Sequence, residues 1–202
     1  MSRKLTRALV AAAVAAAVAA GTALAAQPSV AKDHQRTGSH AWSWELVDGS
    51  PDLVRPTALT VDRSIGARRA ALEVRLAQQL YTFWNTGEEK YLDASVSPDF
   101  ADNTLPPGRP QGPDGPVFAS RNFRAAVPDL TCELADLLIT GDKITARLVF
   151  RGHFTGTFDG VQGKGQKVDF NAIDIQHVGE RQIVEDWHIE DNQTLLSQLG
   201  VD

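Results

Sequence analysis

The sequence predicts an α+β domain in which N-terminal helices pack on a curved antiparallel sheet. Amphipathic helical patterns fill the first half of the domain, and strands with a period of two fill the second half. Within one of these strands the alternation changes phase, which is typical of a β-bulge and predicts a bent sheet. Helices that close one side of a bent sheet enclose a volume, so a ligand pocket is expected there.

The first 26 residues are expected to be a cleaved signal peptide. Arg3, Lys4 and Arg7 precede a run of Ala, Val and Leu that ends in Ala23-Leu24-Ala25, the small-x-small pattern of a signal-peptidase site. This predicts a secreted or periplasmic, that is extracytoplasmic, protein without stable membrane insertion after cleavage. An uncleaved signal anchor is the alternative, but an Ala-rich segment is weakly apolar for a stable span.

Charge argues against nucleic acid as a partner. The chain has 20 Lys and Arg and 25 Asp and Glu residues, and loss of the leader's three basic residues leaves 17 against 25, a net charge of −8. The single cysteine, Cys132, cannot form an internal disulfide and lies in an apolar run, so a buried and inert thiol is expected. The histidines show no metal-ligand spacing, so no metal site is expected.

Residues 27–62 are expected to form a linker or extended arm. Pro28, Pro51 and Pro56, together with several Gly, Ser and Thr residues, leave no helical period in this segment. The folded domain is therefore assigned to residues 63–202.

Three helices are predicted in the first half of the domain. The first covers residues 65–84 and ends before Gly87, which suits a left-handed backbone conformation. Its apolar residues recur at steps of four and three: Leu72, Leu76, Leu80 and Phe83. Shorter helices are expected at residues 88–94 and 117–126, and a loop rich in Pro and Gly at residues 105–116 lies between them.

Two hairpins are predicted in the second half. Residues 131–140 and 143–151 alternate in polarity and are joined by a Gly-Asp turn. A second hairpin follows a Gly-rich connection and spans residues 170–191. A short helix at residues 193–199 ends the domain.

The second hairpin brings polar side chains together. Its even positions carry Asp174, Gln176, Asp186 and His188, whereas its odd positions carry Ile173, Ile175, Trp187 and Ile189. A turn at residues 179–181 places Asp174 opposite or diagonal to His188, roughly 5 to 8 Å apart, as a candidate carboxylate–imidazole pair. Before Ile173 the apolar positions are even, and this reversal is the phase change that predicts the bulge.

Several short motifs in a fixed order resemble the SnoaL-like polyketide cyclases, which belong to the nuclear-transport-factor-2-like superfamily. The resemblance covers about residues 72–200. It rests on FWNTG (83–87), PDF (98–100), DN (102–103), PPG (106–108), GPDG (112–115), VPDL (127–130), GDK (141–143), GHFTG (152–156), IVEDW (183–187) and LLSQLG (195–200). It implies a cone-shaped α+β domain and a homodimer.

The resemblance also implies a reaction. Members of the family are ester cyclases that close a ring by intramolecular aldol addition on polyketide methyl esters, without metal or cofactor. They use an acidic residue that follows the tryptophan of the second hairpin arm, and here that position is His188. The partner histidine of the family falls at Asp174, so the two residue types are exchanged. The family's Gly-Thr-His-Thr-Gly becomes Gly-His-Phe-Thr-Gly here, with Phe154 in place of histidine.

Aldol closure requires a base that removes a proton next to a carbonyl and an acid that protonates the new alkoxide. An imidazole suits both steps near neutral pH. The working hypothesis is that His188 is the acid/base, that Asp174 orients it, and that Asn103 or Asp102 hydrogen-bonds the substrate oxygen. The expected substrate is a small apolar carbonyl compound, and Trp84 and Phe154 are the remaining candidates for binding it.

Two alternatives remain open. The first is that Asp174 and His188 form a structural cross-strand pair in a polar patch. The second is that the domain is a noncatalytic module that binds an apolar ligand or supports dimerisation, since a fold alone does not fix a function.

Overall fold

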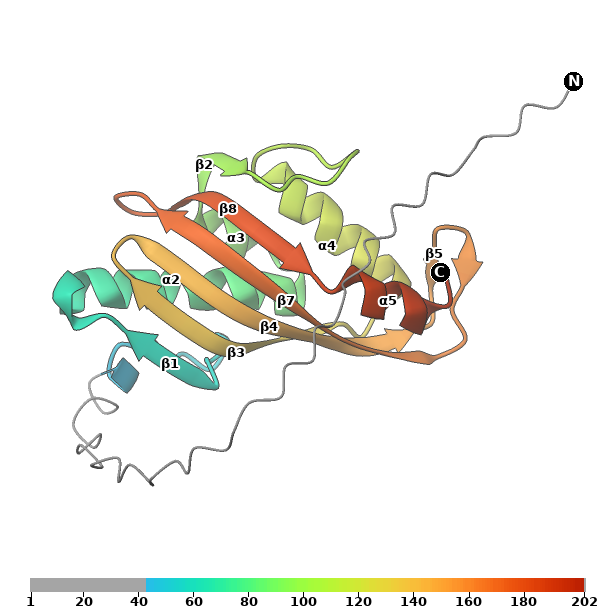
Figure 1. Ribbon diagram of the computed structural model, residues 1–202, viewed down its shortest axis with the longest axis horizontal. Coiled ribbons are helices and arrows are strands. Elements are labelled where there is room, and N and C mark those ends of the chain that lie inside the picture. Colours follow the sequence, from blue (N-terminus) through green and yellow to red (C-terminus); the bar gives the residue numbers. More distant parts are fainter. Residues whose placement is uncertain (1–42, 202) are drawn as a thin grey trace, which may run out of the picture. The chain divides into compact units, whose positions relative to one another are not determined.

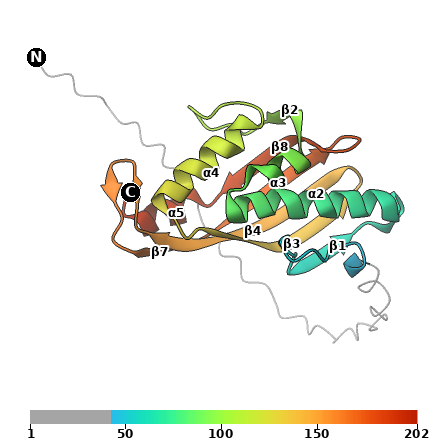
Figure 2. The same ribbon diagram turned by 180° about the vertical axis from the view of Figure 1, so that it is seen from behind.

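The computed structural model describes residues 43–201 of the chain. In this part, three helices lie against one face of a six-stranded mixed sheet, and Figure 2 shows them in front of the strands. The α+β fold class predicted from the sequence is therefore confirmed. The predicted signal peptide lies outside the described residues. No helix among residues 43–201 is long and apolar enough to cross a membrane.

The helices follow the predicted order. They are α2 (Ala67–Thr86), α3 (Glu89–Ser95), α4 (Asp114–Ala126) and the C-terminal α5 (Asn192–Leu199), and a 3-10 turn, Arg63–Ile65, precedes α2. Helix α2 ends as predicted at Gly87, whose φ of 79° is in the left-handed region. Helix α4 begins at Asp114 rather than at residue 117, because Pro116 occupies its first turn, where a proline removes no helical hydrogen bond.

The sheet has the strand order β1-β3-β4-β7-β8-β2 (Figure 1). The strands are β1 (Ala58–Val61), β2 (Val96–Asp102), β3 (Thr131–Thr140), β4 (Lys143–Phe154), β7 (Gln166–Val178) and β8 (Ile183–Glu190). The four central strands form the two antiparallel hairpins that the sequence predicts. The two edge strands, β1 and β2, run parallel to their neighbours and were not predicted. A separate small hairpin, β5 (Thr157–Phe158) with β6 (Val161–Gln162), lies in the Gly-rich connection.

The described part of the expected linker, residues 43–62, belongs to the folded domain. Strand β1 pairs with β3, and the preceding segment is held on α2 by two buried side chains. The Gln78 amide accepts from Asp48 N at 2.9 Å and donates to Val54 O at 3.0 Å, and Thr82 Oγ1 accepts from Val54 N. The domain therefore begins before residue 63. A segment with many prolines has no helical period, yet its backbone still finds partners on a neighbouring helix.

Strand β7 contains no bulge where the sequence predicted one. Its register with β4 runs unbroken from His177 opposite Lys143 to Gln166 opposite Phe154. Even-numbered residues of β7 face the interior along its whole length. The phase change in the sequence has another cause, because the inward residues change from apolar to polar after Ala172 while the backbone continues regularly.

An arginine on α2 fixes the turn of the second hairpin. Arg69 donates to the carbonyl oxygens of Val178 at 2.7 Å and Gly179 at 2.6 Å. The same guanidinium pairs with Glu73, which is fully buried, and burial raises the pKa of that carboxyl despite the hydrogen bond from Arg69. The contact joins the first turns of α2 to the β7–β8 connection.

Candidate active site

A cavity of about 370 Å³ lies between the helices and the inner face of the sheet. Most of its wall is apolar, and aromatic rings dominate it. The aromatic residues of the lining are Trp84, Phe100, Phe118, Phe123, Phe150, Phe158 and Phe170. Phe150 on β4 and Phe170 on β7 stack with their ring centroids 5.2 Å apart, because the strand register sets them opposite each other.

One end of the cavity is polar. Asp174 on β7 and Asp186, His188 and Glu190 on β8 all take even positions, so strand alternation directs them to the same inner face. Asp174 lies directly opposite His188 in the hairpin register, as the sequence predicted. The parallel pairing of β2 with β8 sets Asp102 beside Asp186 and so adds a further carboxyl group.

His188 is held at both of its ring nitrogens by carboxylates. Nε2 is 3.1 Å from Asp102 Oδ2, and Nδ1 is 2.7 Å from Glu190 Oε1. Burial acts to lower the pKa of His188, but the hydrogen bonds and charges of Glu190 and Asp102 outweigh it and raise that pKa to about 9. The ring is therefore an imidazolium at neutral pH, and both of its N–H groups are already donated.

Asp174 has a different environment. Its side chain is buried, and its Oδ2 accepts from Tyr81 Oη at 3.2 Å and from Gln176 Nε2 at 3.4 Å. Burial raises the pKa of Asp174 to about 7, against the lowering effect of the nearby His188 charge. This carboxyl group therefore exchanges its proton close to neutral pH, as a general acid or base requires.

Gln176 connects the two aspartates of the hairpin. Its Nε2 is 2.8 Å from Tyr81 Oη, 3.4 Å from Asp174 Oδ2 and 3.5 Å from Asp186 Oδ1. Burial and then the charge of Asp174 raise the pKa of Asp186 well above its ordinary value. The negative charge of an ionised Asp174 therefore favours the protonated form of Asp186.

The structure brings four of the six predicted site residues to the cavity: Asp174, His188, Asp102 and Trp84. The orienting role expected of Asp174 falls to Asp102 and Glu190, because they bond the imidazole. The side chain of Asn103 is exposed, lies outside the lining and hydrogen-bonds Glu185, since it follows Asp102 by one residue. Phe154 is fully buried in the hydrophobic core and also lies outside the lining.

Glu190, Tyr81 and Arg109 are among the polar residues of the site that were not predicted from the sequence. Glu190 continues the even positions of β8 beyond His188, so strand alternation was a signal that could have found it. Tyr81 lies on α2, three residues before Trp84, which is a spacing that places two side chains on one helical face. Arg109 lies in the Pro- and Gly-rich loop, where no periodicity indicates which residues face inward.

Among residues 43–201, no group of three or more His, Cys, Asp or Glu side chains is arranged to hold a metal ion. Cys132 is buried as expected, and burial raises the pKa of its thiol well above the ordinary value.

Comparisons with known proteins agree with this geometry. The chain is similar to a candidate polyketide cyclase from Bacillus cereus ATCC 10987, with 46% identity over 77% of this chain and 98% of that one and a TM-score of 0.70. It is also similar to TsrD from Streptomyces laurentii, with 28% identity over 65% and 97% of the two chains and a TM-score of 0.60. IdmH, a candidate polyketide cyclase from Streptomyces antibioticus, gives 31% identity, 62% and 96% coverage and a TM-score of 0.56.

A search of curated proteins finds no match. The family profile described as SnoaL-like polyketide cyclase matches residues 74–199, which include the larger part of α2, strands β2 to β8 and every polar residue that lines the cavity. The chain therefore belongs to the SnoaL-like polyketide cyclase family.

Proposed function

We propose that the protein catalyses aldol-type cyclisation or isomerisation of a small apolar carbonyl compound by cofactor-free acid/base chemistry. The observation that carries this proposal is the placement of Asp174, a carboxyl group set into the wall of an otherwise aromatic cavity. Aromatic walls suit a flat, unsaturated substrate, and one proton-exchanging group is the minimum that such chemistry needs. Membership of the cyclase family supports the same class of reaction.

The geometry favours Asp174 rather than His188 as the acid/base. An imidazole accepts a proton only through a ring nitrogen with a free lone pair, and both nitrogens of His188 face carboxylates. Asp174 loses its proton near neutral pH and lines the cavity. The roles assigned from the sequence are thereby exchanged, and His188 serves as a fixed positive charge that favours the ionised form of Asp174.

In the proposed reaction the Asp174 carboxylate removes a proton from the carbon next to a carbonyl. The C–H electron pair becomes the carbon–carbon double bond of an enolate. The enolate carbon then forms a bond to a second carbonyl carbon, and the alkoxide produced takes the proton back from Asp174. In an isomerisation the same proton returns to a different carbon. Both the cyclisation and the isomerisation end with Asp174 ionised again, so neither reaction consumes another reactant.

Solvent deuterium incorporation tests the proposal, because it detects proton removal even when a ring does not close. A panel of β-keto esters and aromatic polyketide analogues is incubated in D₂O with the wild-type protein, with Asp174→Asn, and with Asp136→Asn as a matched control. Asp136 is a half-exposed carboxylate on β3 that pairs with Arg147. We expect exchange that Asp174→Asn abolishes and Asp136→Asn preserves. Equal exchange in both variants would overturn the role of Asp174.

His188→Gln separates the two role assignments. If His188 were the base, this variant would lose exchange at every pH. We expect exchange to persist and its onset to move to higher pH, because the imidazolium no longer lowers the pKa of Asp174. Ligand binding by the cavity without any exchange across the panel would instead favour the noncatalytic binding module.

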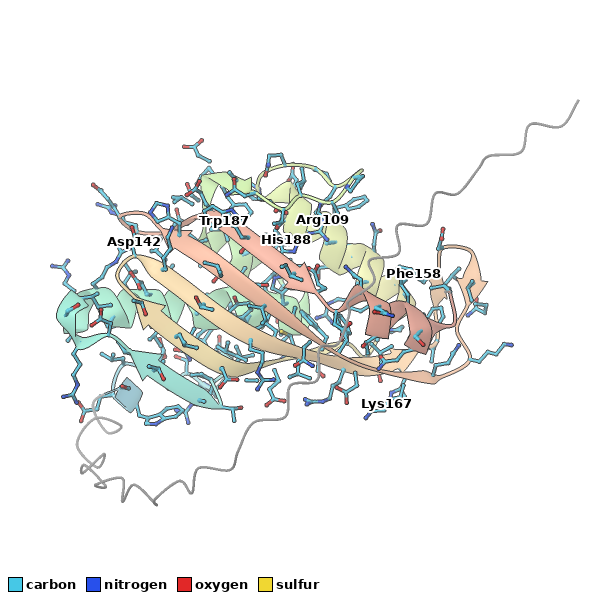
Figure 3. The ribbon with its side chains drawn as sticks, viewed as in Figure 1. Arg109, Asp142, Phe158, Lys167, Trp187 and His188 are labelled. Atoms are coloured by element: carbon cyan, nitrogen blue, oxygen red, sulfur yellow. The ribbon has the colours of Figure 1, made fainter. Side chains whose placement is uncertain are left out.

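We propose that the protein is a homodimer that associates through the outer face of the β7–β8 hairpin. Ile173 and Ile189 on that face are 50% and 74% exposed, and Ile175 is exposed beside them. Trp187, which is labelled in Figure 3, is also exposed on that face. Exposed apolar residues that gather in one patch mark interaction surfaces. Light scattering on the mature protein tests this, and a monomer at high concentration would defeat it.

We also propose that the protein is exported, on the strength of the leader pattern in residues 1–26. N-terminal sequencing of the protein recovered outside the cytoplasm is expected to begin close to residue 27. An intact leader in the recovered protein would contradict cleavage.

A further inference from the structure

Arg109 presents an unused set of hydrogen-bond donors to the cavity. Its side chain is only 19% exposed and forms part of the lining (Figure 3). Its nearest acidic partner within residues 43–201 is Asp102, whose Oδ2 lies 3.8 Å from Nη1, beyond hydrogen-bonding distance. A guanidinium has about five N–H donors, and one that is largely removed from water without hydrogen bonds favours an oxygen-bearing ligand.

The neighbouring carboxylate is already occupied. Asp102 Oδ1 accepts from the backbone N–H of Thr104 at 2.8 Å, and Oδ2 accepts from His188 Nε2 at 3.1 Å. Asp102 is therefore committed to the loop and to the imidazolium. Arg109 has a compensating charge close by, which makes its burial tolerable, but its N–H groups stay available.

The loop holds Arg109 in place before any ligand arrives. The Arg109 N–H donates to Pro106 O at 3.1 Å, and Gly108 has a φ of 86°. With Pro107 at the second position, this is the pattern of a type II turn. The Gln111 side chain fastens the loop to the end of β2, since it accepts from Asp102 N at 2.7 Å and donates to Asp102 O at 3.0 Å. A fixed donor loses little entropy when it binds a ligand.

The site needs such a donor. Proton removal by Asp174 leaves a negative charge on the substrate oxygen, and that charge must be stabilised in an apolar cavity. Among the described residues that line the cavity, two are basic, His188 and Arg109. Both N–H groups of His188 are donated to carboxylates. Arg109 is then the cationic side chain whose donors remain open.

We propose that Arg109 binds the oxygen of the substrate on which negative charge develops, and that it selects carbonyl compounds that form a stabilised enolate, such as β-dicarbonyl or phenolic ring systems. This inference rests on the proposed function, because it names the group that stabilises the enolate formed by Asp174. It also makes Arg109 a catalytic residue in the strict sense, since it touches the reacting atoms.

The test uses para-nitrophenol, which carries an acidic hydroxyl on a flat ring and changes absorbance when it ionises. Wild-type protein is titrated with it near neutral pH, and the phenolate absorbance gives both the affinity and the ionised fraction of bound ligand. We expect the wild-type protein to favour bound phenolate. We expect Arg109→Gln to weaken phenolate binding by about tenfold or more, the usual effect of losing a charged hydrogen bond. Arg121→Gln, on the exposed face of α4, is the matched control and is expected to match the wild type.

Two further variants separate oxyanion binding from simple charge balance. If Arg109 only neutralises Asp102, then Arg109→Lys preserves phenolate binding, and the double variant Arg109→Gln/Asp102→Asn restores it. Either result would overturn the inference, as would a wild-type protein that binds no para-nitrophenol. If Arg109 binds the oxyanion, both variants stay deficient, because neither restores the planar fork of donors.

Failure of this inference is distinguishable from failure of the proposed function. The phenol titration involves no turnover, so its result does not depend on Asp174 acting as a base. Deuterium exchange that survives in Arg109→Gln at the wild-type rate would remove Arg109 from the mechanism and leave Asp174 in it. Arg109-dependent phenolate binding without any exchange would keep the oxyanion site in a noncatalytic protein.

Discussion

The two halves of β7 share one backbone geometry and differ in what they face. In the first half, Val168, Phe170 and Ala172 point inward and are buried, as in any sheet packed on a core. In the second half, Asp174 and Gln176 point inward, while Ile173 and Ile175 are exposed on the outer face. The register with β4 continues unbroken through both halves. The reversal is therefore chemical, and it marks the segment that contributes Asp174 to the polar end of the cavity.

The comparison also separates stability from activity. The first half contributes hydrophobic burial, since Phe170 stacks on Phe150 in the cavity wall. The second half withdraws the Asp174 carboxyl group from water, which opposes folding unless that group stays protonated or paired. Buried carboxyl groups with a raised pKa cluster at functional sites, which is why this one is proposed to act in the reaction. Substitutions in the two halves are thus expected to have opposite consequences.

The largest expected effect is on activity in the second half. Asp174→Asn is expected to lower substrate deuterium exchange by about 10² to 10⁴-fold, the usual contribution of a general base. The same variant is expected to be at least as stable as the wild type above pH 7, because it removes a buried carboxylate. Exchange rates and denaturant unfolding of the same samples measure both. Loss of activity together with loss of stability would mean that Asp174 is structural.

The next effect is on stability in the first half. Phe170→Ala is expected to lower the free energy of unfolding by about 3 to 5 kcal/mol, the range for truncating a buried aromatic side chain. Urea denaturation gives the value. Phe170→Leu is the milder companion variant, and exchange per folded molecule should persist in it because Asp174 is unchanged. If the urea concentration at the midpoint of unfolding were the same in Phe170→Ala as in the wild type, the aromatic wall would not be part of the stabilising core.

Both the activity and the stability of the protein are expected to depend on pH. Exchange is expected to rise as Asp174 ionises near pH 7 and to persist as His188 loses its proton near pH 9, because Asp174 is already ionised there. In the folded protein both pKa values lie above their ordinary values of 3.8 and 6.5. The folded state therefore binds protons more tightly than the unfolded state, and these two groups contribute less stability as pH rises.

For Asp174 this contribution is complete below about pH 4 and lost by about pH 7, and for His188 it is lost between pH 6.5 and about 9. Unfolding experiments at a series of pH values check the sign. Asp174→Asn is expected to remove the loss of stability between about pH 4 and pH 7 and to leave the loss between pH 6.5 and about pH 9 unchanged. If the first of these two losses stays in the variant, it belongs to another group.

The smallest expected effect on the fold concerns the outer face. Ile189→Lys is expected to change the free energy of unfolding of the monomer by about 0.5 kcal/mol or less, since the side chain is 74% exposed. It is expected to abolish dimerisation, because a charge would enter an apolar contact. Light scattering of this variant beside the wild type measures the change. An unchanged dimer would place the interface elsewhere.

The sequence predicts the regular parts of this fold because local patterns determine them. The spacing of Leu76, Leu80 and Phe83 defines the buried face of α2, and the alternation of the hairpin sets Asp174 opposite His188. Strand β2 escapes prediction because its sequence contains Pro98 and Asp99, which disfavour strands. It forms because β8, far away in the chain, offers a free edge.

The site is less predictable than the fold. The partners of His188 are Asp102, which is distant in sequence, and Glu190, whose inward direction follows only from the continued strand. Arg109 reaches the cavity because Gln111 ties its loop to β2, a tertiary contact without local pattern. The predicted bulge was wrong for a related reason, since polar residues on an inner face imitate a shift of phase.

The contact between Arg69 and the hairpin turn has a consequence for how the chain folds. A slip of β8 by one residue would turn Trp187 and Ile189 inward and expel Asp186 and His188, so the slipped pairing also offers apolar side chains to the interior. Burial alone therefore does not select the native alignment of this hairpin. Arg69 recognises the carbonyl oxygens of Val178 and Gly179, which occupy the right place only when the turn is correctly formed. A misaligned hairpin would deprive the Arg69 guanidinium of these two acceptors, so docking of α2 is expected to favour the native alignment.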